Sequence, residues 1–262
     1  MYRAASAYKL PFILAVFSFA VLFNSTAAKG QNEKKVSAEA SDLNQQAIKM
    51  IDGSRYAEAI KVLEKAIQID PSYGALHMNM GTAYLLSEQP ETALVHVKRG
   101  VEIDPERAEG YNQIGVIYDK MGKTDLAIDH LKKAIELKPD YALGYLNLGS
   151  AYLYANRLKP AQTALEKAAK LDPTNTEVRI SLGVVYAKQS RFDQAIAEIK
   201  EATKHSPNDD KANLTLCRIY LMADDRKSAI EMYQSVKSVN IPLADKMFKS
   251  IFSGKVLYVG KK

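Results

Sequence analysis

The sequence predicts an all-α protein, a right-handed α-solenoid of six helix–turn–helix repeats that ends in a capping helix. The first observation is a proline that recurs at a fixed interval of 34 residues, because a period in this range is the signature of a stacked repeat array. The second is an alanine at one fixed place in every repeat, and the third is a small residue at another. The proline series consists of Pro71, Pro105, Pro139, Pro173 and Pro207.

An export signal is expected to precede the repeats. Within residues 1–28, Arg3 and Lys9 form a positive start, and the run from Leu10 to Phe23 is apolar except for one serine. Small residues follow, which completes the layout of a cleaved secretory signal peptide. A membrane-spanning helix needs about 20 apolar residues, so this run is short for a span. A retained anchor in the inner membrane stays as the alternative, and in both cases we expect an exported protein, periplasmic or secreted.

Each repeat is expected to consist of two helices, and a polar linker at residues 29–39 precedes the first of them. When the repeat is numbered so that its proline stands at position 32, position 20 is always alanine and position 8 is Ala, Gly or Cys. Small side chains at these two places let the helix axes approach closely. The proline ends the second helix, because it has no N–H and restricts the residue before it. The predicted repeats are residues 40–73, 74–107, 108–141, 142–175, 176–209 and 210–243.

The turn between the two helices is expected at position 15. Most residues in this column are turn formers, and glycine and asparagine tolerate the left-handed backbone conformation that tight turns require. The column consists of Ser54, Glu88, Gly122, Asn156, Ser190 and Asp224.

These columns resemble the tetratricopeptide repeat, a helix–turn–helix family of the same period, from Ala40 to about Leu243. One departure lies at position 4, where the family favours tryptophan. That column holds Leu43, His77, Tyr111, Tyr145, Arg179 and Asn213. We therefore expect the first helices of the fifth and sixth repeats to pack less tightly. A second departure is Pro90, which falls at the start of a second helix, where proline is tolerated.

Residues 244–262 are expected to cap the array and to end in a short tail. Met247 and Ile251 share one apolar helical face, which can cover the last repeat. The sixth repeat displaces its proline by one residue, to Pro242, where the array gives way to the cap. The stretch 256–259 is strand-like, and it either folds against the last helices or forms an edge for a partner.

The resemblance implies a groove lined by the first helices, on the face that carries positions 5, 6, 9 and 13. Position 6 is polar in every repeat and an amide in most of them. An amide has both a donor and an acceptor, so a ladder of amides can pair with an extended peptide backbone. The alternative is that these amides are a habit of the family without a ligand role. The candidate partner-binding residues are Asn44, Gln45, Asn79, Thr82, Asn112, Gln113, Asn147, Ser150, Ser181, Lys188 and Arg218.

Composition and motifs argue against other classes of function. The formal charge is +6, from 36 Lys and Arg against 30 Asp and Glu, but the signs are interspersed, so no nucleic-acid partner is expected. No Gly-rich phosphate loop, nucleophile elbow or zinc-protease motif occurs, and we expect neither an enzyme nor a cofactor. Cys217 stands at position 8 and is expected to be a buried structural thiol. His96 and His130 share position 23 of adjacent repeats, but a metal pair lacks a third ligand, so no metal is expected.

We therefore expect a non-enzymatic scaffold of the cell envelope that binds a peptide or a helix of a partner protein in its groove. The alternative is an accessory or substrate-recruiting subunit of an envelope assembly machine or enzyme complex, such as one for pilus, outer-membrane or polysaccharide assembly. A third hypothesis is a membrane-tethered array whose leader is not cleaved.

Overall fold

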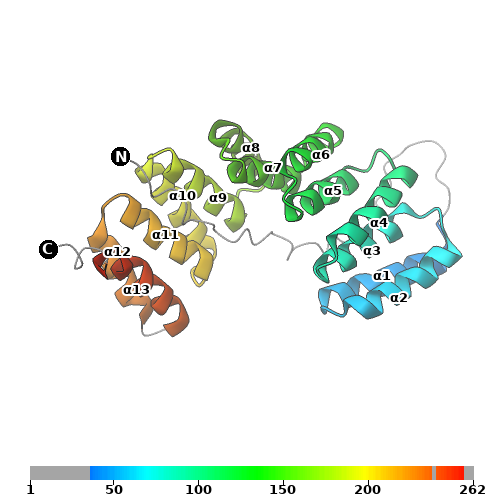
Figure 1. Ribbon diagram of the computed structural model, residues 1–262, viewed down its shortest axis with the longest axis horizontal. Helices are drawn as coiled ribbons and strands as arrows, with labels where there is room; N and C mark the ends of the chain where they lie inside the picture. Colours follow the sequence, from blue (N-terminus) through cyan, green and yellow to red (C-terminus); the bar gives the residue numbers. More distant parts are fainter. Residues whose placement is uncertain (1–35, 238–239, 257–262) are drawn as a thin grey trace. The chain divides into compact units, whose positions relative to one another are not determined.

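The computed structural model describes residues 36–237 and 240–256, with side chains up to Phe252. This part of the chain forms α-helices and no strand, and consecutive helices are arranged as repeated hairpins (Figure 1). The predicted all-α class with tandem helical repeats is therefore confirmed. The chain divides into two compact units, which we call unit 1, up to Lys123, and unit 2, from Thr124. The division falls inside the third predicted repeat, after its first helix. The expected leader and linker, residues 1–35, lie outside the described residues.

Unit 1 contains two complete hairpins and one further first helix. Its helices are α1 (Ala38–Asp52), α2 (Tyr56–Ile69), α3 (Gly74–Leu86), α4 (Pro90–Ile103) and α5 (Ala108–Lys120). Each helix packs against the next one along the chain, and the first helices α1, α3 and α5 also contact one another in sequence. First helices therefore form one layer of the unit and second helices the other, as in a repeat array.

Unit 2 continues the same alternation and ends in an extra helix. Its helices are α6 (Thr124–Leu137), α7 (Ala142–Tyr154), α8 (Leu158–Leu171), α9 (Thr176–Lys188), α10 (Phe192–His205), α11 (Asp210–Met222), α12 (Arg226–Lys237) and α13 (Ile241–Val256). The first helices α7, α9 and α11 contact one another in sequence, and α13 packs on both α11 and α12. None of the described helices is both long enough and apolar enough to span a bilayer.

Small residues set the distance between the two helices of a hairpin. All six alanines at position 20 are fully buried. A Cβ added to Gly81 at position 8 would come within 2.3 Å of Cγ2 of Val97, and one added to Gly183 within 2.6 Å of Cδ1 of Ile199. Both distances are far below van der Waals contact, so any larger side chain at these two glycines would push the hairpin apart. The predicted close approach at positions 8 and 20 is confirmed.

The turns and helix ends follow the predicted columns. Every residue at position 15 has a positive φ, between 57° for Asn156 and 73° for Gly122. The five helices before the proline series each end two residues ahead of their proline, as α2 does at Ile69 before Pro71. The residue before a proline is disfavoured in helical conformation, which accounts for this constant offset. Pro90 is the first residue of α4, where the absent N–H has no partner to lose.

The end of the array differs in detail from the expectation. The last helix, α13, begins at Ile241 rather than at residue 244, so Pro242 lies in its first turn instead of closing the sixth repeat. Proline is compatible with a first turn, and the side-chain oxygen of Asn240 accepts a hydrogen bond from the N–H of Leu243 at 3.0 Å, which caps the helix start. The helix continues to Val256, and the rest of the expected strand-like tail lies outside the described residues.

The apolar face of α13 covers the last repeat. Leu243, Met247 and Ile251 are buried in one cluster with Cys217 and Ala229. Burial raises the pKa of the Cys217 thiol to about 11, and this cysteine has no disulfide partner. It is therefore a buried, protonated thiol that fills the position-8 site, as expected.

Candidate functional site

The candidate residues lie on the first helices, and we call the surface that carries them in each unit the first-helix face. In unit 1 the face consists of Asn44, Gln45, Asn79, Thr82, Asn112 and Gln113 on α1, α3 and α5. In unit 2 it consists of Asn147, Ser150, Ser181, Lys188 and Arg218 on α7, α9 and α11.

Amides on neighbouring first helices of unit 1 bond to each other. The side-chain amide of Asn79 on α3 donates to the side-chain oxygen of Asn44 on α1 at 2.7 Å. Asn44 is almost completely buried, with 2% of its surface exposed, and its own amide lies 3.5 Å from the hydroxyl of Tyr73. Sequence analysis placed these two residues on one face but did not foresee the bond between them.

A second link joins α3 to α5. The amide N–H of Gln113 donates to the hydroxyl of Thr82 at 3.0 Å, and that hydroxyl lies 3.2 Å from the backbone carbonyl of Met78. Gln113 is 5% exposed, and its side-chain oxygen is buried without a hydrogen-bond partner in the described part of the chain. Buried polar atoms are nearly always paired, but this oxygen is enclosed, so a ligand N–H could reach it only after the Gln113 side chain moves.

Exposure varies strongly along the two faces. In unit 1 Asn112 is fully buried and Gln45 is exposed, and the other four candidates are buried. In unit 2 Asn147, Ser150 and Arg218 are half-buried, Lys188 is exposed and Ser181 is buried. Unit 1 therefore presents a nearly uncharged face of buried amides, and unit 2 presents a more open face with two cations.

Positions 4 and 23 of one repeat face each other, which sequence analysis missed. In unit 1 His77 on α3 stacks on His96 of α4, with ring centroids 6.1 Å apart, and His96 also stacks on Tyr84 at 5.2 Å. Burial lowers the pKa of both imidazoles, and for His77 the neighbouring His96 and Arg99 lower it further. The ring partners of His96 are therefore His77 and Tyr84 of its own repeat. The Nδ1 atom of His130 lies 2.9 Å from the carbonyl of Leu126.

The same two positions hold an ion pair in unit 2. Nη1 of Arg179 on α9 donates to Oε2 of Glu198 on α10 at 2.9 Å, and both side chains are 22% exposed. Nη2 of Arg179 donates to the backbone carbonyl of Pro173 at 3.3 Å. The sequence contained a signal for this pairing, because positions 4 and 23 both carry polar residues in the second repeat (His77 and His96) and in the fifth (Arg179 and Glu198).

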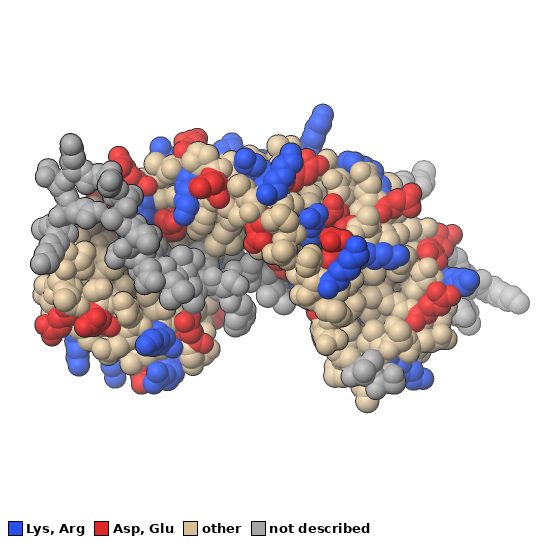
Figure 2. Space-filling model, turned by 180° about the vertical axis from the view of Figure 1, so that it is seen from behind, with Lys and Arg blue, Asp and Glu red and all other residues tan. Residues whose placement is uncertain are grey.

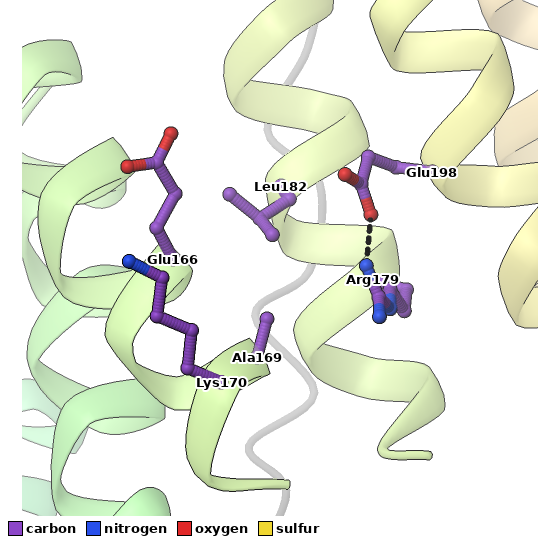
Figure 3. Close-up of a pocket in the computed structure, with 6 residues that line it drawn as sticks. All are labelled: Glu166, Ala169, Lys170, Arg179, Leu182 and Glu198. Atoms are coloured by element: carbon purple, nitrogen blue, oxygen red, sulfur yellow. Dashed lines mark hydrogen bonds and ion pairs between the residues drawn. The ribbon is translucent and has the colours of Figure 1, made fainter. Parts of the chain in front are cut away.

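A cavity of about 370 Å³ opens beside this ion pair (Figure 3). Its lining comes from α8, α9 and α10 and consists of Glu166, Ala169, Lys170, Arg179, Leu182 and Glu198. Arg179, the departure of the fifth repeat at position 4, is one of the residues that line this cavity. Within the described ranges, no three His, Cys, Asp or Glu side chains gather as a metal site would require.

Charged side chains of both signs are mixed over the surface. Figure 2 shows Lys and Arg interspersed with Asp and Glu on the face that it presents, without an extended field of one sign. Mixed charges of this kind are typical of solvated helix faces, whereas nucleic-acid binding uses a basic stripe.

Models of one protein family match most of the repeat region. One tetratricopeptide repeat model matches residues 108–141, a second matches residues 50–112 and 186–240, and a third matches residues 146–210. Together the matched segments cover residues 50–141 and 146–240. No curated protein sequence matches the chain.

Solved structures with the same fold include those of PilF, PilW and YrrB. PilF of Pseudomonas aeruginosa is 19% identical, with a TM-score of 0.70 over 81% of this chain and 97% of that one. PilW, described as a widely conserved type IV pilus biogenesis factor, is 17% identical, with a TM-score of 0.74 over 80% of this chain and 97% of that one. YrrB, described as a repeat protein of the same kind with an unusual peptide-binding site, is 19% identical, with a TM-score of 0.52 over 66% of this chain and 89% of that one. Identities this low establish the shared fold alone.

Proposed function

We propose that this chain, which belongs to the tetratricopeptide repeat family, is a non-enzymatic scaffold. Its first-helix faces bind a peptide segment or a helix of a partner protein. The observation that carries this proposal is Gln113, whose side-chain N–H is satisfied by Thr82 while its oxygen is buried without a partner. A peptide N–H would complete the pairing once the Gln113 side chain moves to expose that oxygen.

The two units favour different partner chemistry. In unit 1 the amides already bond to one another, so a peptide backbone can exchange with those bonds at little net cost in hydrogen bonding. Because that face carries amides and a hydroxyl, the segment that it binds is uncharged. In unit 2 the exposed Lys188 and the half-buried Arg218 favour a segment that carries carboxylates.

Photo-crosslinking in the native cell tests the proposal. A photoreactive residue at Gln45, which is exposed on α1, and one at Lys188, which is exposed on α9, should capture the partner. The matched control is Gln68, which is also exposed but lies on the second helix α2. Capture at Gln68 with none at Gln45 or Lys188 would contradict binding on the first-helix faces. For the captured partner, Gln113→Ala should weaken binding about tenfold, the effect of losing one buried hydrogen bond.

The leader supports an envelope location for this scaffold. The expected signal peptide at residues 1–28 would place the repeats in the periplasm or outside the cell. Amino-terminal sequencing of the protein isolated from its native cell decides between cleavage near Ala28 and a retained membrane anchor. A mature chain that begins at Met1 would leave only the tethered form.

A second candidate is an accessory or substrate-recruiting subunit of an envelope assembly machine. The structural similarity to PilF and PilW, which spans nearly the whole of both proteins, favours pilus assembly among such machines. Co-purification with one complex in fixed stoichiometry would support this role, whereas recovery of several unrelated partners would support a general adaptor.

A further inference from the structure

The last part of the chain carries its whole net charge. Residues 226–262 contain eight of the 36 Lys and Arg residues but only two of the 30 Asp and Glu residues, a balance of +6 that equals the formal charge of the entire chain. Up to Phe252, helices α12 and α13 carry five cations against two carboxylates. The cations are Arg226, Lys227, Lys237, Lys246 and Lys249, and the carboxylates are Glu231 and Asp245. Such an asymmetry favours an anionic partner at this end.

A row of aromatic rings joins α12 to α13, which lie side by side at the end of unit 2 (Figure 1). The ring of Phe248 on α13 lies 4.5 Å from that of Phe252 and 5.9 Å from that of Tyr233 on α12, centroid to centroid. Nζ of Lys237 lies 5.9 Å from the Tyr233 ring, and the guanidinium carbon of Arg226 lies 5.6 Å from the Phe252 ring. The two helices therefore present one aromatic surface with a cation at each end.

Part of this apolar surface is open to solvent. Phe248 is 47% exposed, and Ile241, at the start of the same helix, is 68% exposed. Seven residues correspond to nearly two helical turns, so Ile241 and Phe248 lie on the same side of α13. Lys246 and Lys249 are exposed farther round the helix, and Asp245 is its one carboxylate. Exposed apolar side chains therefore adjoin exposed lysines on the outer side of α13.

Lysine rather than arginine supplies the exposed charge of α13. Arg226 on α12 is half-buried, and its Nη2 donates to the backbone carbonyl of Ile251 at 2.8 Å, so it holds α13 in place. Bidentate recognition of a protein carboxylate uses arginine, whereas lysine is a compact point charge that needs no fixed geometry. Lysines beside exposed Phe and Ile side chains are typical of a surface that lies on anionic lipid headgroups.

We propose that the outer side of α13, with Ile241, Lys246, Phe248 and Lys249, binds the surface of an anionic lipid bilayer. The two ammonium groups lie among the headgroups, and the two apolar side chains enter the interface between headgroups and acyl chains. This lipid-binding surface contains none of the candidate residues of the first-helix faces, so a docked protein keeps them for its protein partner. It is also independent of the leader, and it holds the repeats at a membrane after the leader has been cleaved.

Sedimentation with lipid vesicles tests the proposal. The protein is the expected mature chain, residues 29–262, because an intact leader would itself bind lipid. Vesicles of equal parts phosphatidylglycerol and phosphatidylcholine should bind it at least tenfold more tightly than vesicles of phosphatidylcholine alone, and added salt should weaken the binding. Equal affinity for the two kinds of vesicle would overturn the proposal. Binding of poly-L-glutamate without binding of vesicles would also overturn it, and would assign the surface to an acidic protein.

A charge variant locates the contact. Each lysine near an anionic membrane contributes about fivefold in affinity, so K246Q/K249Q should weaken binding to the anionic vesicles at least tenfold. The matched control is K61Q/K65Q, which removes two exposed lysines from α2 in unit 1 and should have little effect. An equal loss in the two double variants would show that binding follows the net charge of the protein, against a defined surface on α13.

An apolar variant tests insertion into the interface. Ile241→Ser should weaken binding to the anionic vesicles about fivefold, because a largely exposed side chain no longer leaves water on docking. Val95→Ser is the control, since Val95 is 67% exposed on α4 and should be neutral. Circular dichroism verifies that each variant keeps its helices. Unchanged binding by a folded Ile241→Ser protein would contradict insertion at this surface.

Discussion

The facing pair at positions 4 and 23 differs sharply between the two units. Unit 1 holds two stacked imidazoles, His77 and His96, whose pKa values burial lowers, so the neutral rings are the stable form. Unit 2 holds the ion pair of Arg179 and Glu198 with a cavity beside it. The hairpins around both pairs are built alike, from buried small residues at positions 8 and 20. The comparison shows that the small-residue columns maintain the hairpin, which leaves the 4/23 pair free to differ in charge and volume.

The largest effect is expected where the two units are alike. Gly81→Ala and Gly183→Ala should each destabilise their unit by about 1–3 kcal/mol, because a methyl group overpacks a close helix contact. The cost should be greater for Gly81, since its neighbour is a stiff β-branched valine, whereas Gly183 meets the flexible end of an isoleucine. Thermal unfolding followed by circular dichroism measures both. Ala155→Gly, at a half-buried helix end, controls for the alanine–glycine change itself.

The next largest effect on stability is expected to differ between the Arg179–Glu198 pair and the His77–His96 pair. Arg179→Ala should destabilise unit 2 by about 1–2 kcal/mol, because it leaves a largely buried carboxylate without its partner. A double-mutant cycle with Glu198→Ala should give a coupling energy of about 1 kcal/mol, the upper end for exposed pairs. The corresponding cycle with His77→Ala and His96→Ala should give a smaller coupling. Equal coupling energies in both cycles would show that an ion pair and a pair of stacked imidazoles contribute alike to stability.

A smaller effect on the stability of unit 1 is expected from the carboxyl group of Asp119. Asp119 stands at position 12, where the other repeats carry Ile51, Leu85, Leu153, Ala187 and Leu221. Its Oδ1 atom is buried without a partner among the described residues, and burial raises the pKa of the carboxyl from 3.8 to about 6.

The sign of this pH effect follows from the raised pKa. The folded state favours the protonated carboxyl, so its contribution to stability is complete below pH 3.8 and is lost as the pH rises through about 6. Asp119→Leu should therefore stabilise unit 1 at neutral pH by about 1 kcal/mol, a figure reduced for the part of the side chain that water still reaches. Chemical denaturation at acid and neutral pH measures it, and the gain should vanish in acid.

The smallest effect is expected from the histidine pair, because both rings are only half-buried. Unfolded imidazoles take up protons below their ordinary pKa of 6.5, whereas the folded rings resist protonation, so the stability of unit 1 falls as the pH drops below 6.5. His77→Tyr, the residue of the third and fourth repeats, should reduce this loss. Melting temperatures of both proteins across that pH range provide the measurement, and parallel curves would contradict the assignment.

The architecture could be predicted because the same sequence pattern recurs in every repeat. The proline series, the alanine column and the turn column each recur in register, so one ambiguous repeat is corrected by the others. Pro242 shows the limit of that reasoning. It lies outside the exact period, and sequence alone could not tell a proline that ends one helix from a proline in the first turn of the next.

The site could be predicted only as a set of residues on one face. Whether Asn79 meets Asn44 depends on how closely α1 and α3 approach, and the two residues are 35 positions apart in the chain. The exposure of Gln45 beside the burial of Asn44 likewise depends on neighbouring helices rather than on the residue types. The departure at Arg179 was visible in the sequence, but the cavity required knowledge of where its guanidinium points.

The burial of Cys217 beneath α13 makes the end of the array measurable without any introduced label. It is the single cysteine of the chain, and its raised pKa and zero exposure keep the thiolate from forming while α13 is docked. A thiol reagent can react only after the helix detaches, when the pKa returns toward its ordinary value. The rate of alkylation in native solution therefore measures how often the last hairpin opens. A partner that holds α13 in place would lower that rate.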